Sequence, residues 1–405
     1  MKKPELLAPV GSFEKAKTAF KYGADAIYVG TSNLSLRTRV DMNDDELTKI
    51  IEYAHSINKK VYVALNIYAR DNMYEEIKKQ VKRLDKIKAD AVIVSDGGVV
   101  ETVKEVAPNL EIHISTQANT VSYHTCKFWH NNGAKRVILA RELNKEEIKD
   151  IMVNKPNDLE IEMFVHGAIC YGYSGRCHLS DFLANRSANL GECAQSCRWA
   201  YNLYLEEKNN PGLMMPVEQD EHGTYILSSK DMCLIKELPE IIKIGVDSLK
   251  IEGRLKTEYY LATVINTYRH AIDECYGNIE NYDYSKYLNE LEKTKTRGLT
   301  TFYFNDKNNE DFQEYEGKQY NPDYEFGGKI VQENIVEIKN RLNVGDILEL
   351  ILPNKLEPVK FEIKKLWDYE TDEEIDYVNP GKEGQKVKME LPKGAEKGMI
   401  LRRKK

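Results

Sequence analysis

The chain has 405 residues, of which 41% are hydrophobic and 30% are charged, so it can bury a large core and is long enough for two or three domains. Its formal charge of -7 excludes a uniformly basic surface, and a polyanionic partner would have to meet a local basic patch. No stretch approaches the roughly 18 to 20 apolar residues of a membrane span, and the N-terminus lacks the apolar core of a signal peptide. We therefore expect a cytoplasmic protein with no membrane contact.

Short apolar runs alternate with helical patterns over the first part of the chain. The first run, Glu5–Val10, is followed by an amphipathic segment in which Ser12 is placed to cap a helix. Seven further runs follow, at residues 26–30, 60–66, 91–96, 111–116, 136–141, 160–167 and 248–253. Near-continuous hydrophobicity is typical of strands buried on both faces of a parallel sheet. Eight such units predict an α/β fold with a TIM-like (β/α)8 barrel, and an open doubly wound sheet is the alternative.

Polar residues recur where these runs end. In a barrel of this kind the functional residues lie at the C-terminal ends of the strands. The candidates are Asn66, Ser95, Asp96, Thr116, Gln117, Arg141, Glu142, His166, Gly167, Glu252, Gly253 and Arg254. Each one taken singly is equally well explained as a helix cap or a solvated strand end. Their recurrence at strand after strand predicts a site at this end of the barrel.

A cysteine-rich insertion, residues 168–247, separates the seventh run from the eighth. A loop of this length inside a compact domain is usually functional. It contains five of the seven cysteines of the chain, which are Cys170, Cys177, Cys193, Cys197 and Cys233. In a reducing compartment clustered cysteines bind metal or act catalytically more often than they form disulfides. No pair has the two-residue gap of a zinc knuckle, and spacing alone does not choose between a tetrahedral zinc and a four-iron cluster.

The chain changes in character after residue 253. Two helical segments, TEYYLATVINTYRHAIDE and YSKYLNELEKTKTR, precede a polar linker that contains Gly and Pro. Short alternating runs then predict a small C-terminal antiparallel β-barrel. We divide the chain into the barrel at 1–275, a helical and linker extension at 276–323, and this β-domain at 324–405. The last 25 residues, Gly381–Lys405, contain nine Lys or Arg against three Glu, as in a surface that binds a polyanion or in a frayed, solvated tail.

The cysteine segment resembles a known family signature. HGAICYGYSGRCHLSDF followed by GECAQSCRWAY is similar to the signature of peptidase family U32, the collagenase-like proteases. ELLAPVGSFEKAKTAFKYGADAIYVG, ISTQANTVSYHT, ARELNKEEI and SLKIEGRLKTEYY are also similar to segments of that family, so the resemblance covers nearly the whole chain. In its size and its C-terminal β-domain, the chain resembles the TrhP-type proteins of this family. This resemblance implies prephenate-dependent 5-hydroxylation of the tRNA wobble uridine. The resemblance to other members of the family implies two alternative substrates, a ribosomal RNA cytidine and a ubiquinone precursor.

The resemblance also implies a cofactor. Relatives carry a 4Fe-4S cluster, and matching their pattern position by position gives four metal ligands, Cys170, Cys177, Cys193 and Cys233. Cys197 is the alternative ligand, because it lies four residues after Cys193 and the two thiols would share one face of a helix. Zinc is the alternative metal. Cys126 and Cys275 are expected to be buried small hydrophobic residues.

The implied substrates suit residues near the predicted barrel mouth. Planar guanidinium groups bind carboxylates in pairs of hydrogen bonds, so the candidates for contacting prephenate, a dicarboxylate, are Arg37, Arg39, Arg141 and Arg254. His166 is the candidate proton carrier near neutral pH. An anticodon base must be splayed out and stacked to be modified, and the candidate stacking residues are Tyr171, Tyr173, Trp199 and Tyr201. A paralogous subunit is a further candidate partner, beside tRNA.

A peptidase is the alternative function that the family name implies. A thiol protease needs one low-pKa cysteine with an activating histidine, and His166 and His178 lie near Cys170 and Cys177 in the sequence. The chain has neither a His-Glu-x-x-His motif nor a Gly-x-Ser-x-Gly elbow. A third alternative is a scaffold without catalytic activity that holds a structural zinc.

Overall fold

The computed structural model describes most of the chain, with gaps. The described residues are 2–31, 34–35, 44–170, 172–199, 201, 203–206, 208, 211–212, 214–217, 229–305, 323–381 and 384–405. Arg37, Arg39 and Tyr171, which the sequence singled out, lie outside them, and so do residues 306–322 of the predicted linker. In the described part of the chain, no helix has the length and hydropathy needed to cross a membrane.

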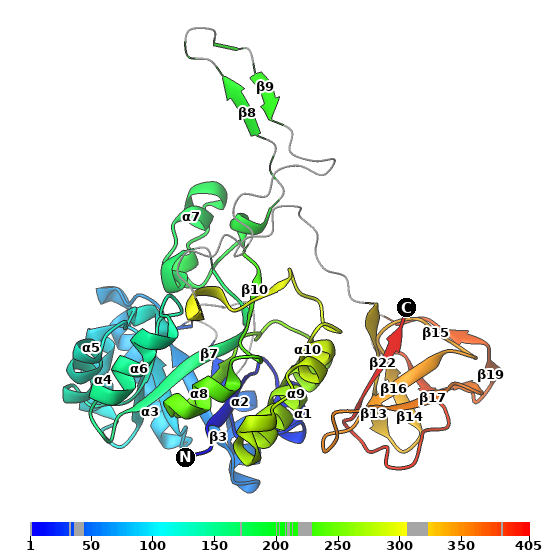
Figure 1. The fold of residues 1–405 in the computed structure, drawn as a ribbon. Helices are drawn as coiled ribbons and strands as arrows, with labels where there is room; N and C mark the ends of the chain where they lie inside the picture. The colour runs from blue at the N-terminus through cyan, green and yellow to red at the C-terminus, as the bar shows by residue number, and fades with distance from the viewer. Residues whose placement is uncertain are drawn as a thin grey trace.

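Eight parallel strands close into a barrel (Figure 1). They are β1 (Glu5–Pro9), β2 (Ala26–Gly30), β3 (Lys60–Leu65), β4 (Ala91–Val94), β5 (Glu111–Ile114), β6 (Ala134–Ile138), β7 (Glu160–Ala168) and β11 (Ser248–Ile251). The strands pair in chain order, and β11 pairs in parallel with both β1 and β7, which closes the barrel. The predicted TIM-like barrel is therefore confirmed, and the open doubly wound sheet is excluded.

Helices surround the barrel (Figure 1). They are α1 (Phe13–Lys21), α2 (Asp44–Ser56), α3 (Tyr74–Lys86), α4 (Gly97–Val106), α5 (Tyr123–Asn131), α6 (Lys145–Asn154), α8 (Leu238–Ile244) and α9 (Glu258–Gly277). Helix α1 begins as predicted, because the Ser12 hydroxyl accepts a hydrogen bond from the backbone N–H of Lys15 at 3.3 Å. Helix α6 begins at a capping box in which Asn144 and Glu147 satisfy each other's backbone N–H groups.

Ion pairs fill the N-terminal half of the barrel interior. Arg136 on β6 donates to Glu5 at 2.6 Å and to Glu162 at 3.0 Å, and Lys250 on β11 donates to Glu162 at 2.7 Å. Burial alone would raise the pKa of Glu162, but the charges of Lys250 and Arg136 hold that pKa below its ordinary value. This packed network occupies the base of the barrel.

The insertion between β7 and β11 adds elements to the barrel. Helix α7 (Leu179–Ala184) lies over the C-terminal end of the barrel, and β8 (Leu203–Glu206) pairs with β9 (Met214–Val217) in a hairpin that stands away from it (Figure 1). Strand β10 (Asp231–Cys233) returns antiparallel to β7 and pairs on its other side with β12 (Leu299–Thr300).

The C-terminal region forms an antiparallel sheet with a core of its own. Its strands, in spatial order, are β17 (Val359–Glu362), β16 (Ile347–Ile351), β22 (Ile400–Lys404), β13 (Tyr324–Gln332), β14 (Ile335–Ile338), β21 (Lys386–Lys388), β18 (Leu366–Asp368) and β19 (Glu374–Ile375). A separate pair joins β15 (Leu342–Asn343) to β20 (Tyr377–Val378). The predicted antiparallel strands are confirmed. The edge strands β17 and β19 do not pair with each other within the described residues, so the sheet forms a half-barrel.

The basic end of the chain is built into this sheet. Strand β22 lies between β16 and β13, and its Arg402 is fully buried between Glu349, 2.8 Å from Nε, and Glu290 of α10 (Ser285–Leu291). Arg403 pairs with Glu325 and with Asp346. The interpretation of this segment as a frayed tail is therefore wrong, because its strand is central and its arginines are paired.

Candidate functional site

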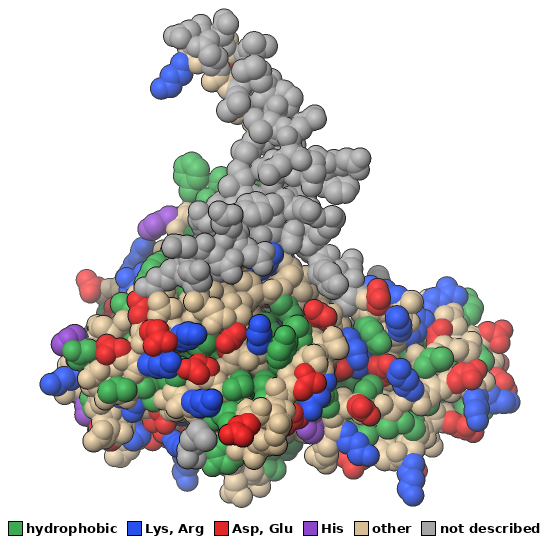
Figure 2. Space-filling model, in the orientation of Figure 1, with side chains coloured by type: hydrophobic (Ala, Val, Ile, Leu, Met, Phe, Trp, Pro, Cys, Tyr) green, Lys and Arg blue, Asp and Glu red, His purple; other side chains and the backbone are tan. Residues whose placement is uncertain are grey.

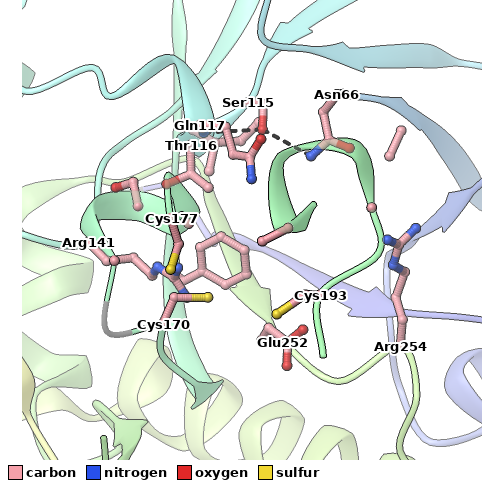
Figure 3. A pocket seen from close by; sticks show the side chains of 18 of the residues that line it. Asn66, Ser115, Thr116, Gln117, Arg141, Cys170, Cys177, Cys193, Glu252 and Arg254 are labelled. Carbon is pink, nitrogen blue, oxygen red and sulfur yellow. Dashed lines mark hydrogen bonds between the residues drawn. The ribbon is translucent and has the colours of Figure 1, made fainter. Parts of the chain in front are cut away.

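A pocket of about 180 Å³ opens at the C-terminal end of the barrel, between the barrel and the cysteine-rich insertion (Figure 3). Its floor is apolar and includes Tyr28 on β2, Ile93 on β4, Ile138 on β6 and Phe164 on β7. Loops of the insertion form the facing wall. A concave, mostly apolar site with a few polar groups at this end of a barrel is the expected position of a binding or active site.

Strand-end residues that the sequence singled out meet in this pocket. Those that line it are Asn66, Thr116, Gln117, Arg141, Glu252 and Arg254. Others serve the fold instead. Asp96, for example, caps α4 by accepting a hydrogen bond from the backbone N–H of Val99 at 3.1 Å. The parallel topology explains the convergence, because all eight barrel strands end at the same rim.

Positive charge predominates in the pocket lining. Arg141, Arg198, Lys250 and Arg254 line it, and Glu252 is the one carboxylate among the described lining residues. Arg254 comes from the chain that follows β11 and donates to the Ser35 hydroxyl at 3.3 Å. A lining with this balance of charge suits an anionic ligand.

Lys250 lies at the floor of the pocket, and the sequence analysis missed it. Its ammonium group pairs with Glu162 at 2.7 Å and lies 4.4 Å from the centre of the Tyr28 ring and 5.4 Å from that of Phe164. Burial lowers its pKa, and Glu162 opposes that shift. A lysine in the middle of an apolar strand, as in SLKIEG, was the available signal.

Two pocket side chains have buried polar atoms without a hydrogen-bond partner in the described part of the chain. These atoms are Nε of Arg141 and Oε1 of Gln117. The Arg141 guanidinium donates through Nη1 to the Ala168 carbonyl at 3.2 Å and stacks 5.3 Å from the Phe164 ring centre. Buried polar groups are nearly always paired in native proteins. Both atoms are therefore positions at which polar atoms of a ligand would complete the hydrogen bonding.

Four thiols of the insertion share this pocket. They are Cys170, Cys177, Cys193 and Cys197, and all are free of disulfide bonds. The backbone N–H groups of Leu179 and Gln195 donate to Sγ of Cys177 at 3.3 Å and of Cys193 at 3.4 Å. Burial raises the pKa of Cys197, the charge of Arg198 opposes that shift, and the charges of the other three thiols raise the pKa further. The four thiols thus line one pocket, and two of their sulfur atoms are held by backbone hydrogen bonds.

Cys233, predicted as a ligand, lies outside this group. Because β10 pairs antiparallel with β7, Cys233 is opposite His166, and both side chains contact the Tyr268 hydroxyl on α9, at 3.9 and 3.5 Å. Burial raises the pKa of the Cys233 thiol to about 11. The structure places Cys197, and not Cys233, with the other three thiols of the predicted set.

His166, predicted as a proton carrier, does not line the pocket. Its ring is buried against Tyr260 and Tyr268 of α9, on the outer side of the barrel wall. Burial lowers the pKa of His166 to about 3. A group that exchanges protons at neutral pH needs a pKa near 7, so neither the position nor the pKa of His166 suits that role.

Comparison with known families and proteins accounts for this combination of barrel, cysteine loop and β-domain. The model of Peptidase family U32 matches residues 11–314, and that of the Peptidase family U32 C-terminal domain matches residues 322–402. The chain belongs to peptidase family U32. It is 38% identical to tRNA hydroxylation protein P of Escherichia coli over 87% of each chain. It is 36% identical to tRNA hydroxylation protein P1 of Bacillus subtilis, over 92% of this chain and 89% of that one.

A further U32 relative is larger. The 23S rRNA 5-hydroxycytidine synthase of Escherichia coli is 33% identical over 74% of this chain, but the match covers 45% of that protein. More than half of that relative therefore lies outside its match to this chain.

The cysteine loop of this U32 protein is fixed to the barrel by Glu142, which follows β6. The Glu142 carboxylate accepts hydrogen bonds from the backbone N–H and from the hydroxyl of Ser174, both at 2.6 Å. Ser174 has a φ of 43°, a left-handed conformation that is costly for a residue with a side chain. Arg176 adds a hydrogen bond from Nε to the Gln117 carbonyl at 3.1 Å. Barrel residues thereby set the positions of the flanking thiols, Cys170 and Cys177.

Two aromatic residues of the insertion, Tyr173 and Trp199, adjoin pocket-lining residues in the sequence. Of the predicted stacking residues, Tyr173 is 52% exposed and Trp199 43% exposed, whereas Tyr201 is held by a hydrogen bond to the Ser196 carbonyl at 2.5 Å. The sequence analysis missed Phe182 of α7, which is 85% exposed. Figure 2 shows apolar side chains standing out from the surface in this part of the molecule.

Proposed function

We propose that this protein is an iron–sulfur-dependent RNA-modifying enzyme that hydroxylates the tRNA wobble uridine at its 5 position, in a reaction that requires prephenate. The observation that carries the proposal is one pocket lined by four thiols that form no disulfide bond and by four cationic side chains. Relatives named tRNA hydroxylation proteins, which match 87% and 92% of the chain, support it. The ribosomal RNA enzyme is matched over 45% of its length, which favours tRNA as the substrate and, with it, a cytoplasmic location.

The proposed cluster ligands are Cys170, Cys177, Cys193 and Cys197. Cys197 takes the place of Cys233 because it lines the same pocket as the other three. The backbone hydrogen bonds to Cys177 and Cys193 are of the kind that tunes iron–sulfur centres. When bound, a cluster supplies one-electron redox chemistry that side chains lack.

We propose a four-iron cluster as the cofactor, and zinc is the alternative metal. Zn–S bonds of about 2.3 Å in a tetrahedral site bring thiolates to within about 3.8 Å of one another. Among the described residues, no three His, Cys, Asp or Glu side chains gather as closely as a single metal ion requires. A four-iron cluster spreads its ligands around a larger body than a single ion does.

Prephenate is the proposed co-substrate because its chemistry matches the lining. Its two carboxylates would bind to cations among Arg141, Lys250 and Arg254, and its ring would pack on Tyr28 and Phe164. The unpaired Nε–H of Arg141 is a donor that such a carboxylate would satisfy. Glu252, which lines the pocket, replaces His166 as the candidate to hold or move a proton.

The peptidase alternative is not supported by the residues at the pocket. A thiol protease needs an imidazole beside its nucleophile, and no histidine lines the pocket in the described part of the chain. His166 faces α9, and the side chain of His178 is exposed. A zinc scaffold without activity leaves the cationic lining and the unpaired polar atoms unexplained.

Nucleoside analysis tests the proposal. Transfer RNA from a strain that lacks this protein and any paralogue should contain no 5-hydroxyuridine derivative at the wobble position. The wild-type chain should restore the modification, and Cys197→Ala should not. Cys126→Ala is the matched control, because Cys126 is buried in α5 and absent from the pocket lining. Retention of the nucleoside in the deletion strain would refute the proposed function, and loss of 5-hydroxycytidine from ribosomal RNA instead would change the substrate.

A further inference from the structure

Four cationic side chains crowd the surface beside the cysteine pocket. We call them the basic cluster, and they are Arg198, Lys256, Lys295 and Arg297. They come from the loop after Cys197, the turn before α9 and the segment between α10 and β12. The ammonium group of Lys256 donates to the Lys295 carbonyl at 3.4 Å, which joins two of these segments. Burial lowers the pKa of Lys256, the charge of Asp231 opposes that shift, and the charges of the other three cations lower the pKa further.

Among the described residues, one carboxylate, that of Asp231, accompanies the basic cluster. Arg297 pairs with Asp231. In the ranges that the structure describes, no carboxylate lies within ion-pair distance of Arg198, Lys256 or Lys295, although the chain as a whole has a net charge of -7. Cations held together without counter-charges repel one another, and a polyanion that bridges them removes this cost. The basic cluster is therefore a local exception on an acidic protein.

Apolar side chains accompany the basic cluster at the edge of the pocket. Arg198 and Leu255 line the pocket, and Trp199 and Lys256 follow them directly in the chain. Trp199 is 43% exposed and Leu255 is 44% exposed. Surfaces that bind single-stranded nucleic acids combine cations for the phosphates with exposed aromatic faces on which bases stack. This edge of the pocket has both.

We infer that the basic cluster binds the sugar-phosphate backbone of a single-stranded RNA loop, and that Trp199 stacks on a base next to the one that enters the pocket. The inference rests on the proposed function and extends it by assigning the RNA-binding surface to the barrel and its insertion. The alternative surface, the basic end of the C-terminal half-barrel, has its two arginines, Arg402 and Arg403, already paired with carboxylates.

A binding measurement tests this inference. Fluorescence anisotropy would report the affinity of the full-length protein for a labelled anticodon stem-loop over a range of salt concentrations. Lys256→Gln/Lys295→Gln should weaken binding by about tenfold and reduce the log–log salt slope by about 1.4, or about 0.7 for each lost phosphate contact. The matched control is Lys60→Gln/Lys135→Gln, which removes the same charge from exposed side chains at the opposite end of the barrel. The control should bind as the wild type does.

Three further variants keep the test independent of misfolding. Lys256→Arg/Lys295→Arg retains both charges and should retain binding. Trp199→Ala changes an exposed side chain without altering charge and should weaken binding by about fivefold, whereas Trp199→Phe should preserve most of it.

Unchanged affinity and salt slope in Lys256→Gln/Lys295→Gln would overturn the inference and leave the proposed function standing, since nucleoside analysis tests that function separately. An equal loss in the control pair would also overturn it, because the effect would then be one of overall charge. Equally tight binding of poly-glutamate would contradict it too, and would assign the basic cluster to an acidic protein partner.

Discussion

Gly30 and Arg254 are in direct contact across the mouth of the barrel. A Cβ atom at residue 30 would lie 1.8 Å from Nη1 of Arg254 and 2.4 Å from the Ser35 hydroxyl. The Arg254 guanidinium, which follows β11, therefore lies over the last residue of β2, in space that only a glycine leaves open. The glycine that ends the second strand thus determines where a pocket arginine, 224 positions later in the chain, can be placed.

The Gly30→Ala variant should displace Arg254 from the pocket lining. We expect it to weaken prephenate binding by about tenfold and to destabilise the fold by about 1–3 kcal/mol, as overpacked sites do. Titration calorimetry with prephenate and thermal unfolding would measure the two effects. Gly97→Ala is the control, since a Cβ at that residue meets nothing within 4 Å. Wild-type affinity in Gly30→Ala would show that Arg254 does not contact prephenate.

Substitutions of Cys197 and Cys233 should differ in their effect on the metal. Because Cys197 lines the pocket and Cys233 lies against Tyr268, Cys197→Ala should lose iron, whereas Cys233→Ala should keep it. The measurements are the iron content of anaerobically purified protein and its absorbance at about 400 nm. The reverse result would restore the ligand set predicted from the sequence.

Loss of the Glu142 carboxylate should loosen the cysteine loop. Glu142→Ala removes two hydrogen bonds to Ser174 and should cost about 1–3 kcal/mol of stability. Faster hydrogen exchange in residues 172–177 and faster iron loss to a chelator would accompany it. Glu146→Ala is a suitable comparison, because Glu146 is exposed on α6 and pairs with the exposed Lys149. If the hydrogen exchange of residues 172–177 is equally fast in both variants, Glu142 does not position the loop.

Arg402 should be required for stability and not for RNA binding. Arg402→Met removes the buried guanidinium between Glu290 and Glu349 and leaves these carboxylates only the more exposed Lys293 and Lys360, so we expect a loss of about 3–5 kcal/mol in urea unfolding. Lys405→Met, at an exposed position, should change stability little. A large loss of RNA affinity in a folded Arg402→Met protein would contradict the structural role assigned here.

The ion network in the barrel predicts acid sensitivity. The pKa of Glu162 is held below its ordinary value, so Glu162 stabilises the fold above its unfolded pKa of about 4.3, and this stability is lost as pH falls through the folded pKa. Glu162→Gln leaves Lys250 and Arg136 short of a buried partner and should lose about 3–5 kcal/mol at neutral pH. Urea unfolding over a pH series should show a shallower acid limb for the variant. If the stabilities of the variant and the wild type fell in parallel as the pH is lowered, Glu162 would be excluded as the source of the acid sensitivity.

Local sequence patterns were sufficient to predict the barrel. Apolar runs and the Ser12 cap act over a few residues, so the eight strands could be located from the sequence. The convergence of Gln117, Arg141 and Arg254 on one pocket also followed, because parallel strands of a closed barrel end at the same rim.

Only the tertiary structure decided which of the cysteine and histidine side chains enter the pocket. Along β7, Glu162 and Phe164 face the barrel interior, and simple alternation would place His166 there too. The pairing of β7 with β11 is irregular between Lys250 and Ile251, opposite His166, and the imidazole contacts α9 instead. Cys233 shares that outward face because β10 pairs with β7 at His166. Strand register and long-range pairing set these directions, and neither can be read from the spacing of cysteines along the chain.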